Sequence, residues 1–304
     1  MNRETQRLER YREAASLLPE RLQWAALSCP AEQRASAEEF RLRTGQPLSL
    51  LGPSGETALE TDAVSAQDLQ GILDRATEFS VYRSADSIRQ GYVTVRGGCR
   101  VGLCGTSVLR GGEVVTLQEL SSLSIRIARE LPGIAAELYP RLWEGERFTS
   151  TLLVAPPGAG KTTMLRDLIR CLAEGSAEHP PLRVAVADER GEIAAVCKGT
   201  PQFQIGSHTD VLSGAPKEAA ILMLLRSMNP QVIALDEITA PGDIRSMQLA
   251  ANCGVAFLAT VHGRDVEELR RRRIFRELLD TELFHQFVIL ERQGRERCCR
   301  VERC

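Results

Sequence analysis

The stretch TLLVAPPGAGKTTMLRDLIR, at residues 151–170, decides the fold of this chain. It opens with an apolar run that predicts a buried strand, passes through a glycine-containing loop, and ends in residues whose apolar positions share one helical face. The loop at residues 155–162 matches the phosphate-binding P-loop at every fixed position except the first, where Ala155 stands for the usual glycine. We expect this alanine to be tolerated, because it lies at the strand exit, before the turn that faces the phosphates.

A strand, loop and helix of this kind bind the phosphates of a nucleotide. Backbone N–H groups of the loop and of the helix N-terminus surround the phosphate oxygens, and Gly158 and Gly160 allow backbone angles that a Cβ atom would resist. Lys161 is expected to reach the β- and γ-phosphates, and the Thr162 hydroxyl to bind Mg²⁺. The predicted nucleotide-binding residues are Pro157, Gly158, Ala159, Gly160, Lys161, Thr162 and Thr163.

Composition and charge indicate an ordinary globular protein. The 304 residues, of which 43% are hydrophobic and 26% charged, are enough for about two domains. The net charge of −2 gives no general attraction to nucleic acid or to a membrane surface. The polar N-terminus does not resemble a signal peptide, and no run of about 18 apolar residues occurs, so we expect no transmembrane segment.

Nine cysteines are scattered along the chain without a Cys-x-x-Cys pair. A nucleotide-using chain belongs in a reducing compartment, so we expect free thiols. Cys298, Cys299 and Cys304 cluster near the C-terminus, but adjacent cysteines with no histidine nearby are a poor match to a zinc site.

The chain divides into two modules of different character. Residues 1–120 predict an α+β N-terminal domain, with helices within 1–28 and 66–76, strands within 38–51, and a meander of short strands with glycine turns over 88–117. Residues 121–145 are expected to form a linker and a connecting helix, placed at 131–142.

Residues 146–304 alternate strands and helices, which predicts a mostly parallel sheet with helices on both faces. The predicted strands are 152–154, 183–187, 232–235, 255–260 and 287–290. The predicted helices are 161–173, 217–228, 242–252 and 265–280.

Acidic residues follow two of these strands. Asp188, Glu189 and Glu192 follow the strand at 183–187, at the carboxyl end where open α/β sheets place their sites. Such carboxylates can orient or deprotonate an attacking water, or hold Mg²⁺ through water. Four apolar residues before Asp236 and Glu237 form a Walker B pattern, in which Asp236 lies near the metal and Glu237 polarises water for in-line attack. The alternative for each segment is a polar strand end without catalytic function.

Thr260 and His262 end another buried strand and are candidates for sensing the γ-phosphate, although a lone histidine is more often structural. The charge of phosphoryl transfer is often met by an arginine from a neighbouring subunit. Candidates for that arginine are Arg226, Arg100 and Arg126. The run of arginines at 270–273 lies among glutamates and is interpreted as a solvated face, with a partner or membrane contact as the alternative.

Several motifs resemble the stage III sporulation protein AA family. They are DERGEI at 188–193, GSHTDVL at 206–212, PK at 216–217, LRSMNPQVI at 225–233 and DEI at 236–238, with RLRTGQPL at 41–48 and the glycine-rich residues 91–102 upstream. The resemblance covers about residues 35–292. This chain departs from the family pattern at Ala155 and at TAPGD, residues 239–243, where the family usually carries a glycine and an acidic pair.

The family is similar to secretion and type IV pilus ATPases. The resemblance therefore implies a RecA-like P-loop NTPase core behind the smaller α+β domain, and a Mg²⁺-dependent ATPase that assembles into a homohexameric ring. It also implies a cytoplasmic protein, peripheral at the membrane through membrane proteins of a channel complex between mother cell and forespore in endospore formation.

The resemblance also assigns site residues. Residues 188–192 look like the acidic box of the related ATPases, and residues 260–262 look like their histidine box. The expected cofactors are ATP and Mg²⁺, with Thr162 and Asp236 at the metal. The expected catalytic residues are Glu237, Glu189, Glu192, His262 and Arg226.

Two other functions stay open. A nucleotide-gated assembly scaffold would bind ATP but hydrolyse little of it, and a RecA-like motor would act on nucleic acid. The acidic balance, and the lack of a basic strip with interleaved aromatic residues, count against the motor on nucleic acid. We therefore expect no nucleic-acid partner.

Overall fold

The computed structural model describes residues 3–78, 85–293 and 296–303. The chain forms two compact units: Met1–Arg129 with Cys197–Gln202, and Glu130–Val196 with Phe203–Cys304. The first unit extends beyond position 120 because the strand β6, Glu113–Arg126, continues through residues that we expected to link the two modules.

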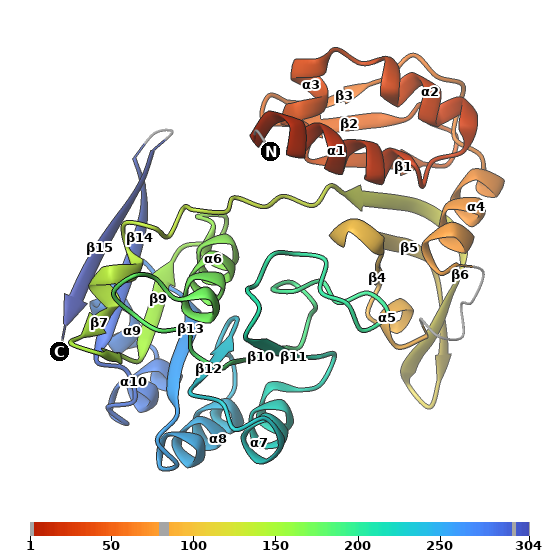
Figure 1. The fold of residues 1–304 in the computed structure, drawn as a ribbon. Helices are drawn as coiled ribbons and strands as arrows, with labels where there is room; N and C mark the ends of the chain where they lie inside the picture. The colour runs from red at the N-terminus through yellow and green to blue at the C-terminus, as the bar shows by residue number, and fades with distance from the viewer. Residues whose placement is uncertain (1–2, 79–84, 294–295, 304) are drawn as a thin grey trace. The chain divides into compact units, whose positions relative to one another are not determined.

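The first unit is a six-stranded antiparallel sheet with helices, as the N-terminal pattern predicts (Figure 1). Its strand order is β3-β2-β1-β6-β5-β4. The strands are β1 (Glu39–Arg43), β2 (Ser49–Gly52), β3 (Gly55–Ala58), β4 (Tyr92–Thr94), β5 (Arg100–Arg110) and β6. The helices are α1 (Arg3–Ala15), α2 (Glu20–Ser28), α3 (Ala31–Ser36), α4 (Ala66–Ala76) and α5 (Ala85–Arg89).

Aromatic packing joins the first helix of this unit to its sheet. The rings of Tyr11 on α1 and Phe40 on β1 lie 5.0 Å apart and both side chains are buried. The Tyr11 hydroxyl donates to the Ala26 carbonyl of α2 at 2.8 Å, so the buried polar atom is satisfied. The segment Cys197–Gln202 belongs to the same unit, and Gln202 Oε1 accepts a hydrogen bond from the Gly97 N–H at 2.8 Å.

The second unit is built on a seven-stranded sheet with the order β11-β10-β12-β13-β9-β14-β15. All neighbours are parallel except β14 and β15, which form an antiparallel hairpin. The strands are β9 (Thr151–Ala155), β10 (Val184–Asp188), β11 (Thr209–Ser213), β12 (Val232–Leu235), β13 (Ala256–His262), β14 (Gln286–Gln293) and β15 (Glu296–Arg303). The helices are α6 (Lys161–Glu174), α7 (Lys217–Ser227), α8 (Pro241–Ala251), α9 (Val266–Arg271) and α10 (Arg273–Leu279). A short hairpin of β7 (Trp143–Glu144) and β8 (Arg147–Phe148) precedes β9.

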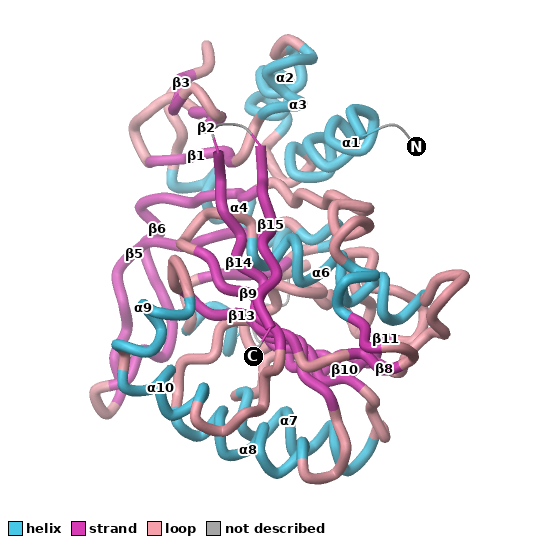
Figure 2. The backbone as a smooth tube through the Cα atoms, turned by 90° about the vertical axis from the view of Figure 1, so that its left-hand side faces the viewer, coloured by secondary structure: helices cyan, strands magenta, loops and turns pink. Residues whose placement is uncertain are grey.

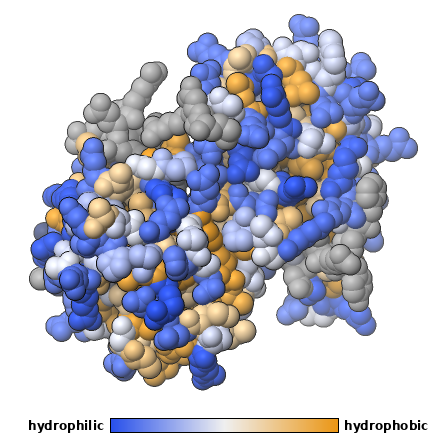
Figure 3. Space-filling model, viewed as in Figure 1, coloured by the Kyte–Doolittle hydropathy of each residue, from blue (hydrophilic) through white to orange (hydrophobic). Residues whose placement is uncertain are grey.

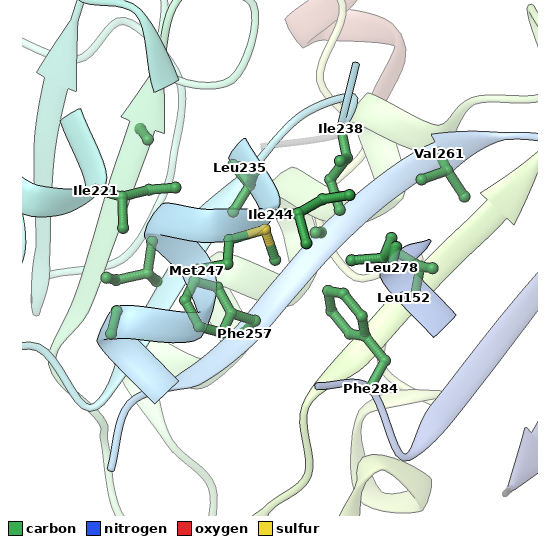
Figure 4. Close-up of a cluster of buried hydrophobic side chains, with 14 of the residues drawn as sticks. Leu152, Ile221, Leu235, Ile238, Ile244, Met247, Phe257, Val261, Leu278 and Phe284 are labelled. Carbon is green, nitrogen blue, oxygen red and sulfur yellow. The ribbon is translucent and has the colours of Figure 1, made fainter. Parts of the chain in front are cut away.

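Helices cover both faces of this sheet, with α6 on one side and α7 and α8 on the other (Figure 1 and Figure 2). Alternate residues of each strand face opposite sides. Leu152 and Phe257 therefore join the core beneath α7 and α8, together with Met247 and Phe284 (Figure 4). Burying each such side chain stabilises the fold by roughly 1.5–3 kcal/mol. The mostly parallel, two-faced architecture confirms the predicted fold class.

The prediction of a connecting helix at 131–142 is wrong. That segment forms turns and one short 3₁₀ turn, Tyr139–Leu142. Gly133 has φ of 87°, outside the helical region, and the N–H groups of Gly133 and Ala135 donate to the buried carboxylate of Asp167 at 3.0 and 2.8 Å. A side chain from α6 thus supplies the acceptors that a helix would have supplied from its own backbone.

Three further details differ from the sequence pattern. Strands β11 and β15 were not predicted, and the helix expected over 265–280 is divided by Arg272, whose ψ of 123° is extended. Cys298 and Cys299 lie in β15, whereas Cys304 lies outside the described residues.

The surface is largely hydrophilic, with small apolar patches among polar side chains on the face seen in Figure 3. Across the part of the chain that the structure describes, no helix combines the length and apolar character needed to cross a membrane.

Candidate functional site

The parallel strands of the second unit bring the predicted site residues other than Arg226 to one edge of the sheet. The strands β10, β12, β13 and β9 are neighbours in that order. Asp188 ends β10, Asp236 follows β12, His262 ends β13, and the P-loop follows β9. Ligand sites of open α/β sheets form at this carboxyl edge.

The P-loop backbone requires glycine at two positions. Gly158 has φ of 75°, and Gly160, which precedes α6, has φ of 92°, both in the left-handed region that a Cβ atom disfavours. Ala155 differs, because it is a buried strand residue whose carbonyl accepts a hydrogen bond from the Gly263 N–H at 3.2 Å. The first position of the motif therefore needs no glycine here.

A hydroxyl at the start of α6 lies next to a carboxylate that follows β12, and both offer oxygen atoms to a metal ion. Thr162 Oγ1 donates to Asp236 Oδ2 at 2.7 Å, and the buried hydroxyl of Thr260 donates to Asp236 Oδ1. Mg²⁺ prefers oxygen ligands and is commonly held by one or two protein groups, waters and phosphates. This donor set fits that ion.

His262 lies between Lys161 and Glu237. Lys161 Nζ is 2.7 Å from His262 Nδ1, and His262 Nε2 is 3.0 Å from Glu237 Oε1. Because an ammonium group only donates, Nδ1 accepts, and the ring proton lies on Nε2, which donates to Glu237. Burial lowers the pKa of Lys161, while the charges of Asp236 and Glu237 oppose that shift.

Glu237 has an unusual backbone conformation. Its φ of 56° lies in the left-handed region, its N–H donates to Thr260 Oγ1 at 2.9 Å, and its carboxylate lies 3.3 Å from Arg190 Nη1. Such a conformation in a residue other than glycine costs about 1–3 kcal/mol and is concentrated at functional sites. The Glu237 side chain is 29% exposed, so water reaches the carboxylate.

Asp188 organises the acidic loop from inside. It is 2% exposed, and its carboxylate accepts backbone hydrogen bonds from Glu192, Ile193 and Ala194 at 2.9, 3.1 and 2.9 Å. Burial raises the pKa of Asp188, and the three N–H donors counteract only part of that effect. Arg166 of α6 closes the same loop by donating to the carbonyls of Ile193 and Glu192, each at 2.8 Å.

The acids that follow β10 and those that follow β12 line one pocket. Glu189 and Glu192 face it from the loop after β10, and Asp236 and Glu237 from the end of β12. Arg190 and Lys217 are the basic residues of its lining. The pocket therefore places several carboxylates around a space large enough for a water molecule.

Of the three arginine candidates, Arg226 alone belongs to the same unit as the pocket. Arg226 is exposed in the last turn of α7, at the opposite end of that helix from the pocket, and Arg100 and Arg126 belong to the first unit. Asp243, at the departure from the family pattern, is buried and accepts from the N–H groups of Thr239 and Ala240 at 3.0 and 3.1 Å. That carboxylate caps the start of α8.

Sequence reasoning missed Arg190 and Lys217 as members of the pocket. Arg190 lies inside the motif DERGEI, so its position beside two acids was a usable signal. Lys217 lies 28 residues beyond Glu189, and only the pairing of β10 with β11 brings them together.

Comparisons with known proteins agree with this geometry. The family model described as sporulation stage III, protein AA, matches residues 10–301. The stage III sporulation protein AA of Bacillus subtilis (strain 168) is 36% identical over 280 residues, which cover 92% of this chain and 91% of that protein.

Solved structures support the same fold. The Legionella pneumophila ATPase DotB aligns with a TM-score of 0.55 at 15% identity, covering 88% of this chain and 76% of DotB. The pilus retraction motor PilT, solved with bound ADP, aligns with a TM-score of 0.55 at 17% identity, covering 87% of this chain and 78% of PilT. These similarities confirm the RecA-like core expected from the motifs, and the matched length and identity show that the chain belongs to the sporulation stage III protein AA family.

Proposed function

We propose that this chain is a Mg²⁺-dependent ATPase subunit that energises a secretion-like membrane channel complex during endospore formation. One observation carries the proposal: Lys161, Thr162, Asp236 and Glu237 converge at one sheet edge within hydrogen-bonding reach of one another or of a shared partner. Membership of a sporulation family and the fold of secretion and pilus ATPases add the cellular setting.

Each group has a distinct task in this proposal. Pro157 to Thr163 surround the phosphates, and Lys161 exchanges His262 for a phosphate oxygen. Thr162 and Asp236 hold Mg²⁺, which when bound neutralises phosphate charge. Glu237 orients the attacking water and accepts its proton, with Glu189 and Glu192 as further acids of the pocket.

Assembly completes the proposed site. Arg226 lies in the last turn of α7, at the other end of that helix from the pocket, so in this proposal it would act on the site of a neighbouring subunit. We propose a homohexameric ring, cytoplasmic and held at the membrane by protein partners, in which Arg226, Arg100 or Arg126 serves the adjacent site.

Two substitutions test the assignment. Lys161→Ala should abolish binding of a fluorescent ATP analogue, because the phosphates lose their cation. Glu237→Gln should keep that binding and lower turnover by about 100-fold or more, because the amide is not a base. Lys198→Ala and Glu277→Gln, on exposed side chains, are the matched controls.

Turnover measured against protein concentration, with the molecular mass determined in parallel, tests the ring. Activity that rises with assembly supports a site shared between subunits. Unchanged turnover in Glu237→Gln would remove its assigned role and make Glu189 the base. Binding without turnover in the unaltered chain would favour the scaffold, and stimulation by single-stranded DNA would favour the motor on nucleic acid.

A further inference from the structure

Lys217 is a buried lysine in the acidic pocket. It is the first residue of α7 and its side chain is 6% exposed. Its Nζ donates to Glu189 Oε2 at 2.5 Å, and both residues line the pocket that contains Asp236 and Glu237. The P-loop chemistry described above uses Glu189 but gives Lys217 no task.

The composition makes this lysine unusual. Three of the 38 basic residues of the chain are lysines, at positions 161, 198 and 217, and the other 35 are arginines. Lys198 is exposed, whereas Lys161 and Lys217 are buried at the same sheet edge. A chain that uses arginine almost everywhere therefore has lysine at two buried positions of this edge, whereas the buried Arg166 donates to backbone carbonyls of the acidic loop. A compact ammonium group fits where a planar guanidinium is larger.

The stability of α7 does not account for Lys217. A cation at a helix N-terminus is opposed by the helix dipole, and a buried ammonium group loses its hydration. Both effects disfavour lysine at this position, and the carboxylate of Glu189 offsets them. The ion pair of Lys217 and Glu189 therefore orients the two side chains and adds no net stability to α7.

Local structure delivers Lys217 to Glu189. Strand β11 runs parallel to β10, and the Gly214 N–H donates to the Asp188 carbonyl at 3.1 Å. Pro216, with φ of −53°, is the N-cap residue of α7, so Lys217 takes the first helical position. The backbone on both sides of the ion pair is therefore held by the sheet.

We propose that Lys217 is a positioning residue that fixes the carboxylate of Glu189 for the hydrolytic reaction, an inference that rests on the proposed ATPase function. Lys217 holds Oε2, which leaves Oε1 to accept a hydrogen bond from a reacting water. In this proposal Lys217 binds the carboxylate of Glu189 and not the nucleotide. Its loss should therefore affect the reaction step and spare nucleotide binding.

Lys217→Met, Glu189→Gln, the double variant and the control Lys198→Met test this inference. For Lys217→Met we expect kcat to fall by roughly 100-fold, as for a misplaced reacting group, with the Kd for ADP within about 2-fold of the unaltered chain. If the two residues act as one unit, the double variant should lie within about 3-fold of the slower single variant. Lys198→Met should match the unaltered chain.

Three results would overturn the positioning role: normal kcat in Lys217→Met, multiplied losses in the double variant, or a large loss of ADP affinity. If Lys217→Met does not fold, the double variant, which leaves no unpaired charge, is compared with Glu189→Gln alone; equal kcat supports the inference and a further loss contradicts it. Absence of turnover in the unaltered chain would contradict the proposed function itself, a result distinct from the other three.

Discussion

Asp188→Asn tests whether the first acid of the 188–192 loop holds structure or takes part in chemistry. The carboxylate accepts three backbone N–H groups, two on Oδ1 and one on Oδ2. An asparagine offers one acceptor oxygen, so at least one buried N–H would face an amide NH₂ group instead.

The cost follows from these contacts. A hydrogen bond to a charged group contributes about 1.5–3 kcal/mol, and an unpaired buried donor costs a similar amount. Relief of the burial penalty on the charged carboxylate offsets part of this loss. We expect a net destabilisation of about 2 kcal/mol, which for a unit of this size lowers Tm by roughly 4–8 °C. Asp188→Ala, which loses every acceptor, should cost more.

Calorimetry and urea unfolding measure the effect, with Asp210→Asn as the control. Asp210 is exposed on the neighbouring strand β11, so its substitution should stay within about 0.5 kcal/mol. A Tm unchanged in Asp188→Asn, together with a large loss of turnover, would refute the structural role and place Asp188 in the chemistry.

The loss of folding stability in Asp188→Asn should depend on pH, and the raised pKa of Asp188 gives its direction. Burial raises the pKa of Asp188 above its ordinary value of 3.8, so folding favours the protonated form. The stability contributed by protonation is complete below pH 3.8 and is lost as the pH rises through the folded-state pKa. The destabilisation in Asp188→Asn should therefore grow as the pH is lowered from neutral, because the variant cannot gain that proton.

Three other outcomes are expected. In urea unfolding, Gly206→Ala should lower the free energy of unfolding by at least about 2 kcal/mol more than Gly254→Ala does. Both glycines have φ of 86°, but only at Gly206 would a Cβ lie 2.6 Å from a neighbouring Cβ. Equal losses in the two variants would contradict this. In His262→Ala the Kd for ADP should stay the same or decrease, because the P-loop lysine loses a competing partner. A higher Kd would mean that the imidazole contacts the phosphates. Iodoacetamide at pH 8 should modify the exposed Cys253 before Cys171, because burial raises the pKa of the Cys171 thiol to about 11; mass mapping decides the order.

Local patterns were sufficient for the core of the second unit. The apolar runs of β9, β10 and β12 are buried on both faces of a parallel sheet, so they appear in the sequence as continuous apolar segments. The acids that follow them are then placed by the geometry of parallel strands alone. This is why the P-loop and both acidic segments could be predicted without a structure.

Contacts between segments that are distant in sequence explain the predictions that failed. β15 is an edge strand whose sequence, ERCCRVER, is charged, so its pairing with β14 gives no apolar pattern to detect. Residues 131–142 carry helical apolar spacing, yet Asp167, more than 30 residues away in sequence, binds their N–H groups. The contact between Lys217 and Glu189 was equally hard to predict, because it depends on the pairing of β10 with β11.

The contact between His262 and Lys161 depends on strand register. β13 pairs with β9 so that His262 lies opposite Ala155, six residues before the P-loop lysine. A slip of one residue would bring Val261 or Gly263 to that place and turn every core side chain of β13 to the wrong face. The burial of Phe257, Ala259 and Val261 therefore specifies the register that joins the two reactive groups.

This register brings Lys161 and Glu237 to opposite ring nitrogens of the His262 imidazole. Under the proposed function, a phosphate oxygen would take Lys161 from His262 and exchange one hydrogen bond of a charged donor, about 1.5–3 kcal/mol, for a stronger bond between two charged groups. His262 Nε2 can keep its bond to Glu237 throughout, because it uses the other ring nitrogen. Under the proposed function, a phosphate bound by Lys161 would therefore change the surroundings of Glu237 through His262, which the pairing of β13 with β9 positions.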